Sequence, residues 1–181
     1  KGLKLVFCGD GRNNVANSLM VACSKLGVNY TLAAPKSLWP DENLVNICKD
    51  IAISTNCQIE FEEDIIKATK DANCIYTDVW VSMGEADNIW EERLNLLKNY
   101  QVNMNVLNNA SQDVIFLHCL PSFHDLNTTI GEEIYKKFGL KEMEVTDEVF
   151  RSKYSKVFDE AENRMHTIKA VMYATLKDKD E

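Results

Sequence analysis

Short runs of aliphatic and β-branched residues alternate along this chain with longer stretches of helical periodicity. This alternation is typical of βαβ units, in which each strand is followed by a helix that crosses back over the sheet. It predicts an α/β fold, namely a three-layer, Rossmann-like parallel sheet flanked by helices. With 181 residues, 45% of them hydrophobic, the chain has the size and composition of one domain with a substantial core.

The pattern predicts five strands, which are expected at 3–8, 30–33, 59–61, 74–77 and 114–117. Helices are expected at 13–25, 41–56, 64–71, 90–100, 102–108 and 130–138, followed by an extended piece near 144–145 and a helical turn at 148–151. No linker is visible, so residues 1–158 are predicted to form one α/β domain. Residues 159–181 are predicted to form its C-terminal helix and a solvated tail.

The predicted last helix has more apolar residues than a single surface stripe requires. They include Met165, Ile168, Val171, Met172 and Leu176. Two interpretations are open. The helix contacts two surfaces, one of them outside this domain, or it is a well-buried core helix.

The charge of the chain bears on its partners. A formal net charge of −8 opposes non-specific binding to nucleic acid or to an anionic membrane, so neither is an expected partner. No apolar run approaches the roughly 20 residues that a membrane-spanning helix needs. The chain opens directly into a strand rather than a signal peptide, which predicts a cytoplasmic protein, or one of an organelle matrix if a transit peptide has been removed.

Six cysteines are scattered along the chain without a CxxC pair or the Cys/His spacing of a zinc site. They are expected to be reduced and mostly buried. His118, His124 and Asp125 also match no usual ligand pattern, so no metal site is predicted.

Polar motifs follow three of the predicted strands: GDGRNN at 9–14, TDVWVSMGE at 77–85 and HCLP at 118–121. The carboxyl ends of parallel strands meet at one edge of a sheet, where open α/β folds bind ligands. The three motifs therefore predict a single small-molecule site.

The first motif could cradle a phosphate through Gly9, Gly11 and the following helix N-terminus. However, Asn14 occupies the third position of a GxGxxG pattern, and the second strand ends without an acid to hold a ribose, so a dinucleotide is disfavoured. Asn13 or Asn14 could instead donate hydrogen bonds to a carboxylate. The alternative is that one of them only caps the helix.

The second motif places Asp78, Ser82 and Glu85 on one loop. A carboxylate there suits a substrate ammonium group, and Ser82 can add a neutral hydrogen bond. The alternative is an acid that caps a helix or organises the loop.

In the third motif, His118 and Cys119 are adjacent in an extended chain and point to opposite sides, which argues against a nucleophile and base pair. Cys119 could still contact a substrate amine. Arg164, in the last helix, follows Glu160 and Glu162 and could belong to a surface ion-pair network. If it faces the same crevice, it can bind carboxyl or phosphoryl oxygens in a fork.

Five segments together make the chain resemble the ornithine carbamoyltransferase family over essentially its whole length. They are GDGRNNVANSL, TDVWVSMGE, FLHCLPSFHD, MEVTDEVF and FDEAENRMHTIKAVM. The resemblance implies a C-terminal, ornithine-binding domain whose last helix packs on a preceding domain that carries the carbamoyl phosphate site. The Ser-x-Arg-Thr and His-Pro-x-Gln motifs of that preceding domain do not occur in this sequence.

The resemblance also implies a role for each matching residue. Asn14 would hold the α-carboxylate of L-ornithine, and Asp78 and Ser82 its α-amino group, with the Met83 backbone completing the clamp. Cys119 and Leu120 would line the site of the δ-amine, and Arg164 would reach toward carbamoyl phosphate. Cys119, Asp78 and Arg164 are thus the implied catalytic residues.

The implied reaction transfers the carbamoyl group of carbamoyl phosphate to the δ-amine of ornithine, giving citrulline and phosphate in arginine metabolism, here expected as arginine biosynthesis. It needs no metal or organic cofactor, and the implied whole transferase is a homotrimer. The isolated domain is expected to be nearly inactive, since both substrates must be held for transfer. Two other functions stay open: a nucleotide-dependent oxidoreductase that uses GDGRNN, and a non-catalytic amino-acid-binding or subunit-interaction module.

Overall fold

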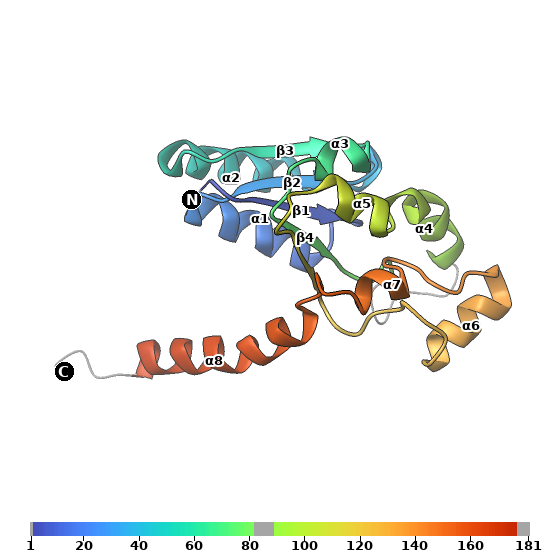
Figure 1. Ribbon diagram of the computed structural model, residues 1–181. Helices are drawn as coiled ribbons and strands as arrows, with labels where there is room; N and C mark the ends of the chain where they lie inside the picture. Colours follow the sequence, from blue (N-terminus) through green and yellow to red (C-terminus); the bar gives the residue numbers. More distant parts are fainter. Residues whose placement is uncertain (1, 82–88, 177–181) are drawn as a thin grey trace.

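A computed structural model describes residues 2–81 and 89–176 of the chain (Figure 1). The described residues form one five-stranded parallel sheet with strand order β3-β2-β1-β4-β5. The strands are β1 (Lys4–Cys8), β2 (Asn29–Ala33), β3 (Ile59–Glu62), β4 (Cys74–Thr77) and β5 (Ile115–His118). The predicted strands are confirmed to within about a residue at either end, the usual uncertainty of a strand or helix boundary.

The main helices are α1 (Asn14–Leu26), α2 (Glu42–Thr55), α3 (Ile65–Thr69), α4 (Ile89–Leu97), α5 (Met104–Asn109), α6 (Thr129–Phe138), α7 (Asp147–Phe150) and α8 (Val157–Leu176). Side chains explain their starts, because Asp41 and Asp64 accept backbone N–H groups from the first turns of α2 and α3. Gly27 ends α1 in the left-handed conformation that glycine adopts without strain.

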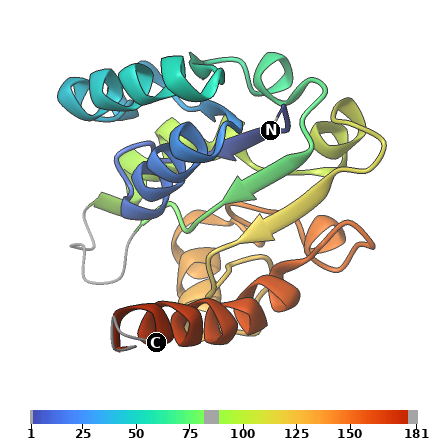
Figure 2. The same cartoon turned by 90° about the vertical axis from the view of Figure 1, so that its left-hand side faces the viewer.

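The two faces of the sheet are covered by different helices, as Figures 1 and 2 show. Alternate residues of a strand point to opposite faces. In β1, Phe7 packs with Met20 of α1 and Cys48 of α2, whereas Val6 and Cys8 belong to the cluster on the other face. That second cluster includes residues of α3, α4 and α5. The predicted α/β fold, a parallel sheet between two helical layers, is confirmed.

Several boundaries differ from the prediction, among them the ends of α3 at Thr69 and of α4 at Leu97. Val102 does not begin a helix but forms an isolated bridge with Val145, because the Asn103 side chain caps α5 by accepting the N–H groups of Asn105 and Val106. The last helix begins at Val157, before the predicted boundary at 159.

Helix α8 leaves the body of the domain, and most of its length lies away from the sheet (Figure 1). Beyond the buried Val157, its large apolar side chains are exposed: Phe158, Met165, Ile168, Val171, Met172, Tyr173 and Leu176. The interpretation as a core helix is therefore wrong for this chain. None of the helices in the described ranges has the length and apolar character needed to cross a membrane.

Candidate functional site

The predicted motifs converge where the strand order changes direction. Strand β1 continues through α1 to β2 on one side, whereas its other neighbour, β4, continues to β5. At such a switch point, open α/β sheets bind ligands outside the carboxyl ends of the strands, and we call this position between β1 and β4 the crevice. Gly11 lies in the loop after β1, and a Cβ atom there would meet a side-chain carbon of Leu32 at 2.3 Å and the carbonyl oxygen of Leu38 at 2.6 Å. The GDG loop therefore needs glycine at that position.

Asp78 lies in this crevice at the end of β4 and is 8% exposed. Its Oδ2 accepts a hydrogen bond from Asn13 Nδ2 at 3.0 Å, and its Oδ1 accepts the Val79 N–H at 2.8 Å. Burial raises the pKa of the Asp78 carboxyl above its usual value, although these two hydrogen bonds oppose the rise. A buried carboxylate whose desolvation is only partly offset by hydrogen bonds is a suitable partner for a substrate cation.

The two asparagines of the GDGRNN motif have different surroundings. Asn13 is buried and caps α1, since its Oδ1 accepts the Val15 N–H at 2.6 Å while its amide binds Asp78. Asn14 is the first residue of α1 and is exposed. The capping alternative thus holds for Asn13, whereas the Asn14 side chain is exposed at the start of α1. Ser82 and Met83, and with them Glu85, lie outside the described residues.

Cys119 follows β5 and is half-buried, and Leu120 beside it is 37% exposed. Burial raises the pKa of the Cys119 thiol above its ordinary value. The negative charges of Asp78 and Glu160 raise it further, whereas Arg164 lowers it. The thiol is therefore protonated near neutral pH, which supports the expectation that Cys119 does not act as a nucleophile.

A buried ion pair supports the start of the HCLP segment. The side chains of His118 and Glu144 are fully buried, with 3.0 Å between Nε2 and Oε1. Glu144 Oε1 also accepts from Ser122 Oγ and from the Phe123 N–H, at 3.1 and 2.6 Å. His118 Nδ1 lies 2.7 Å from the carbonyl oxygen of Cys119, which can only accept. Both ring nitrogens therefore face acceptors, an arrangement that an imidazolium satisfies.

Arg164 lies on the exposed part of α8, one helical turn after Glu160. The Glu160 carboxylate reaches back to the sheet. Its Oε1 accepts the Tyr76 hydroxyl at 2.5 Å, and its Oε2 accepts the backbone N–H of His118 at 3.2 Å. The structure thus brings Asn13, Asp78 and Cys119 to one edge of the sheet, with the first turns of α8 beside them.

Sequence reasoning missed three groups that support this edge: Glu144, the half-buried Glu160 in its contact with the sheet, and the pair formed by Asp10 and Arg93. Arg93 of α4 binds Asp10 of the GDG loop at 2.5 Å, and both side chains are largely buried. These contacts join segments far apart in the chain. No local spacing marks them, and only the charge of Asp10 within a glycine-rich loop gave a signal.

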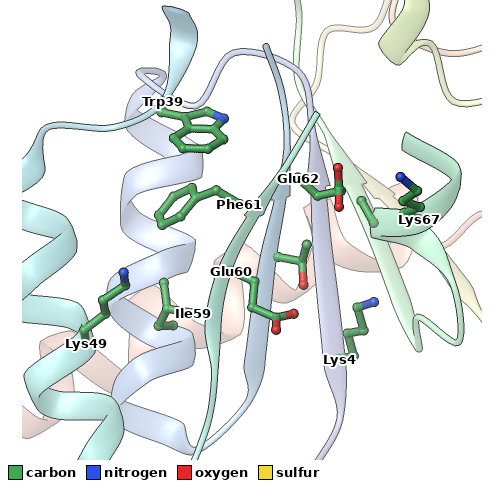
Figure 3. Close-up of a pocket in the computed structure, with 10 residues that line it drawn as sticks. Lys4, Trp39, Lys49, Ile59, Glu60, Phe61, Glu62 and Lys67 are labelled. Atoms are coloured by element: carbon green, nitrogen blue, oxygen red, sulfur yellow. The ribbon is translucent and has the colours of Figure 1, made fainter. Parts of the chain in front are cut away.

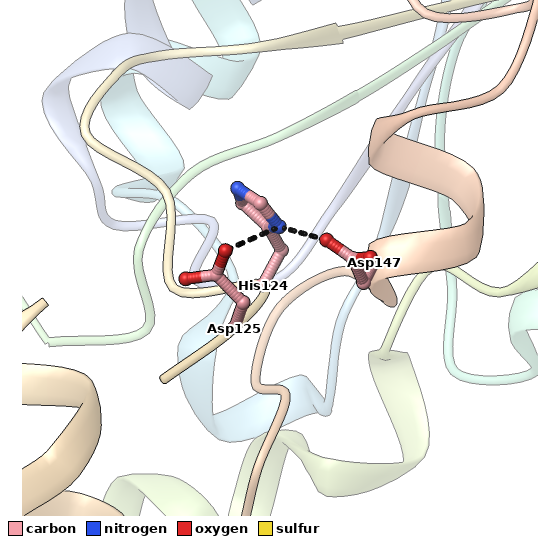
Figure 4. Close-up of side chains that lie close together, drawn as sticks. All are labelled: His124, Asp125 and Asp147. Carbon is pink, nitrogen blue, oxygen red and sulfur yellow. Dashed lines mark hydrogen bonds and ion pairs between the residues drawn. The ribbon is translucent and has the colours of Figure 1, made fainter. Parts of the chain in front are cut away.

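The described residues also contain a cluster of His124, Asp125 and Asp147 whose ligand-type atoms lie within 4.8 Å of one another (Figure 4). His124 Nδ1 lies 2.7 Å from Asp147 Oδ1. Arg151 already binds both carboxylates, at 2.8 Å to Asp147 and 3.3 Å to Asp125. Because a guanidinium already neutralises these acids, the cluster is better described as an ion-pair network that ties α7 to the segment after β5.

A separate hollow of about 380 Å³ lies beside the edge strand β3 (Figure 3). Trp39 and Phe61 form one part of its wall, with ring centroids 5.3 Å apart. The other part carries both lysines and glutamates, among them Lys4, Glu60 and Glu62. None of its lining residues comes from the three predicted motifs, so this hollow is distinct from the crevice.

Comparison with known families decides what kind of crevice this is. A family model described as aspartate/ornithine carbamoyltransferase, Asp/Orn binding domain, matches residues 1–175. The chain belongs to this family. The family resemblance predicted from the five sequence segments is therefore confirmed, and the crevice occupies the domain that the model describes as binding the amino acid.

Individual relatives agree with the family model. A protein from Treponema denticola named "Ornithine carbamoyltransferase, catabolic" is 62% identical over 176 residues, which are 97% of this chain and 52% of that protein. A Bacillus licheniformis protein of the same name is 58% identical, over 99% of this chain and 54% of its own length. The chain spans about half the length of these curated relatives.

Solved structures give the same result. Ornithine carbamoyltransferase from Pyrococcus furiosus is similar with a TM-score of 0.81 and 41% identity, over 96% of this chain and 49% of that one. Ornithine transcarbamoylase from Giardia lamblia has a TM-score of 0.82 at 30% identity, over 98% of this chain and 52% of that one. The fold of this family is thus the fold of the chain.

Proposed function

We propose that this chain is the L-ornithine-binding half of an ornithine carbamoyltransferase. The observation that carries the proposal is Asp78, a buried carboxylate in the crevice between β1 and β4 of a domain from the Asp/Orn-binding family. A carboxylate at this position attracts the α-ammonium of ornithine and repels the second carboxylate of aspartate. Ornithine is therefore the preferred amino acid.

In the proposed complex, Asn14 donates to the α-carboxylate at the N-terminus of α1, where an anion is favoured. Asp78 and Ser82 hold the α-amino group, together with the backbone of Met83. Cys119 and Leu120 border the δ-amine. Exposure of Asn14 and Leu120 beside the crevice supports these assignments.

The proposed chemistry begins with a neutral δ-amine, because an ammonium has no lone pair with which to attack. Its nitrogen bonds to the carbamoyl carbon, the bond from that carbon to the phosphate oxygen breaks, and the nitrogen loses one proton, giving citrulline and phosphate. A protonated Cys119 thiol cannot accept that proton, so the ionised carboxylate of Asp78 is the better acceptor of the two. Arg164 stabilises charge on the phosphate by its fork geometry.

Carbamoyl phosphate is held mostly by a second domain in this proposal, and α8, from about residue 159 onward, packs on that domain. The exposed apolar side chains of α8 support this arrangement, since a contiguous apolar face of this kind marks an interaction surface. The chain alone would be nearly inactive because it holds only one of two reactants, and fixing both accounts for much of the rate of such transfers.

The whole enzyme is proposed to be a homotrimer of the cytoplasm that acts in arginine metabolism, without a cofactor. Two similar bacterial proteins carry the word catabolic in their names. Because a catalyst accelerates both directions through one transition state, the proposal includes the reverse reaction, in which phosphate cleaves citrulline.

Calorimetric titration of this chain tests the proposed amino-acid site. L-Ornithine is expected to bind saturably with one site per chain, and L-aspartate to bind at least about tenfold more weakly because the negative charge of Asp78 disfavours a second carboxylate nearby. A nicotinamide cofactor is the comparison ligand for the oxidoreductase alternative. Tighter binding of aspartate or of the cofactor would contradict the proposal.

A further inference from the structure

Glu160 is exceptional among the residues of α8. Between Val157 and Leu176, the part of this helix that the structure describes, Val157 is buried, Glu160 is half-buried and every other residue is exposed. The Glu160 carboxylate contacts two strands, through the Tyr76 hydroxyl of β4 and the backbone N–H of His118 in β5. One acidic side chain therefore attaches an otherwise exposed helix to the sheet.

The position of this contact follows from how β5 ends. Along the outer edge of β5, Phe116 exchanges backbone hydrogen bonds with the segment before α8, accepting from the Lys156 N–H and donating to the Tyr154 carbonyl oxygen. The next N–H on that edge belongs to His118. The neighbouring segment has by then entered α8, so its backbone offers no carbonyl oxygen to this N–H. Glu160 Oε2 takes the place of the missing backbone carbonyl at 3.2 Å. Without it, the strand would end on a buried, unpaired donor.

Both ends of this contact are close to groups of the proposed site. His118 immediately precedes Cys119, whereas Arg164 follows Glu160 by one turn and so lies on the same face of α8. The charge of Glu160 raises the pKa of the Cys119 thiol and the charge of Arg164 lowers it, so these three groups lie near one another. Other contacts also hold the start of α8. They include the buried Val157 and the edge-on ring contact between Phe158 and Phe150.

We propose that Glu160 is a positioning residue, which fixes the first turn of α8 to β4 and β5 and thereby sets where Arg164 lies relative to Asp78 and Cys119. The proposal rests on the proposed function, because Arg164 needs a defined position only if it binds a substrate. Tyr76 contributes through its hydroxyl. Glu160 itself touches no reacting atom.

Hydrogen exchange in this chain tests the attachment separately from any activity. In a Glu160→Gln variant, an amide replaces the carboxylate and can accept only one of the two donors. Backbone amides of 157–164 and of His118 are expected to exchange at least about tenfold faster. The matched control is Glu162→Gln, which removes the same charge from an exposed position of the same helix. Unchanged exchange in Glu160→Gln would overturn the proposal.

Kinetics in a two-domain protein test the consequence for Arg164. The two-domain protein is a chimera in which this chain takes the place of the matching half of the Treponema denticola relative, which is 62% identical to it. Glu160→Gln is expected to lower kcat by about 100-fold when Arg164 is present, because misplacing a group by about 1 Å can cost that much. Tyr76→Phe, which removes one of the two hydrogen bonds, is expected to lower kcat by less.

If Glu160 had only a structural role, Glu160→Gln would lower kcat by the same factor whichever residue occupies position 164. In an Arg164→Ala background, Glu160→Gln is expected to change kcat by less than about threefold, since the two residues act through one position. An equal loss in both backgrounds would overturn the proposal. A chimera with no turnover before any substitution would contradict the proposed function instead, and hydrogen exchange would still decide whether Glu160 attaches α8.

Discussion

Replacing Asp78 by asparagine is expected to weaken L-ornithine binding by roughly 30-fold to several thousand-fold, equivalent to about 2–5 kcal/mol. The variant keeps the shape of the side chain but removes the charge that the substrate ammonium would pair with. In the wild-type chain, Asn13 Nδ2 and the Val79 N–H each donate to one of the two Asp78 oxygens. The asparagine variant has one side-chain oxygen and can therefore accept only one of these two hydrogen bonds. Calorimetry with L-ornithine, together with thermal unfolding of the same sample, measures both effects.

The pH dependence of binding gives a second measurement on the same variant. Burial raises the pKa of Asp78 above its ordinary value of 3.8. Binding of ornithine requires the ionised form, so affinity is expected to fall as the pH drops through this raised value, and to lose that dependence in Asp78→Asn. Asp50→Asn, which removes an exposed acid from α2, is the matched control. Wild-type affinity in Asp78→Asn would show that the clamp is misassigned.

Replacing Glu144 by glutamine is expected to destabilise the fold by roughly 3–5 kcal/mol, the usual cost of removing one partner of a buried ion pair. The variant leaves His118 without its counter-charge, and it replaces the acceptor that binds His118, Ser122 and the Phe123 N–H. For a domain of this length the melting temperature is expected to fall by about 10 °C. Thermal unfolding measures the change, with Glu148→Gln as an exposed control.

The same pair predicts how stability depends on pH. Burial alone would raise the pKa of Glu144, but the hydrogen bond and charge of His118, with the Phe123 N–H, bring it below the ordinary value of 4.5. A carboxyl whose pKa is lower in the folded state contributes stability above its unfolded pKa, about 4.3 for glutamate, and loses it as the pH falls through the folded value. The stability of the Glu144→Gln variant should lack this dependence on acid pH. An unchanged slope of stability against pH would contradict the assignment.

Local patterns predicted the sheet because the signals for strands and helix ends are local. Asp41 and Asp64, which cap α2 and α3, and Gly27, which ends α1, each act on their own turn of helix. The meeting of Asp78 with the GDGRNN loop was also predictable, since the carboxyl ends of parallel strands share one edge of the sheet.

Contacts that depend on side-chain reach were not predictable. Glu144 binds His118 from 26 positions away, and Glu160 reaches His118 across 42. Each looks in the sequence like an ordinary surface acid, because burial and partner are set by how the segments pack. The wrong prediction of a helix at Val102 has a similar cause. Val102 pairs with Val145, which is distant in the sequence, and this tertiary contact outweighs the local helical pattern.

Citrulline formation by a two-domain chimera, with this chain joined to the remaining half of the Treponema denticola relative, tests the central claim most directly. The claim predicts that the chimera carbamoylates L-ornithine with carbamoyl phosphate, that it discriminates against L-aspartate by at least about 100-fold, and that Asp78→Asn abolishes most of the activity. A folded chimera that carbamoylates aspartate, or one that acts on ornithine equally well without the Asp78 carboxylate, would contradict it.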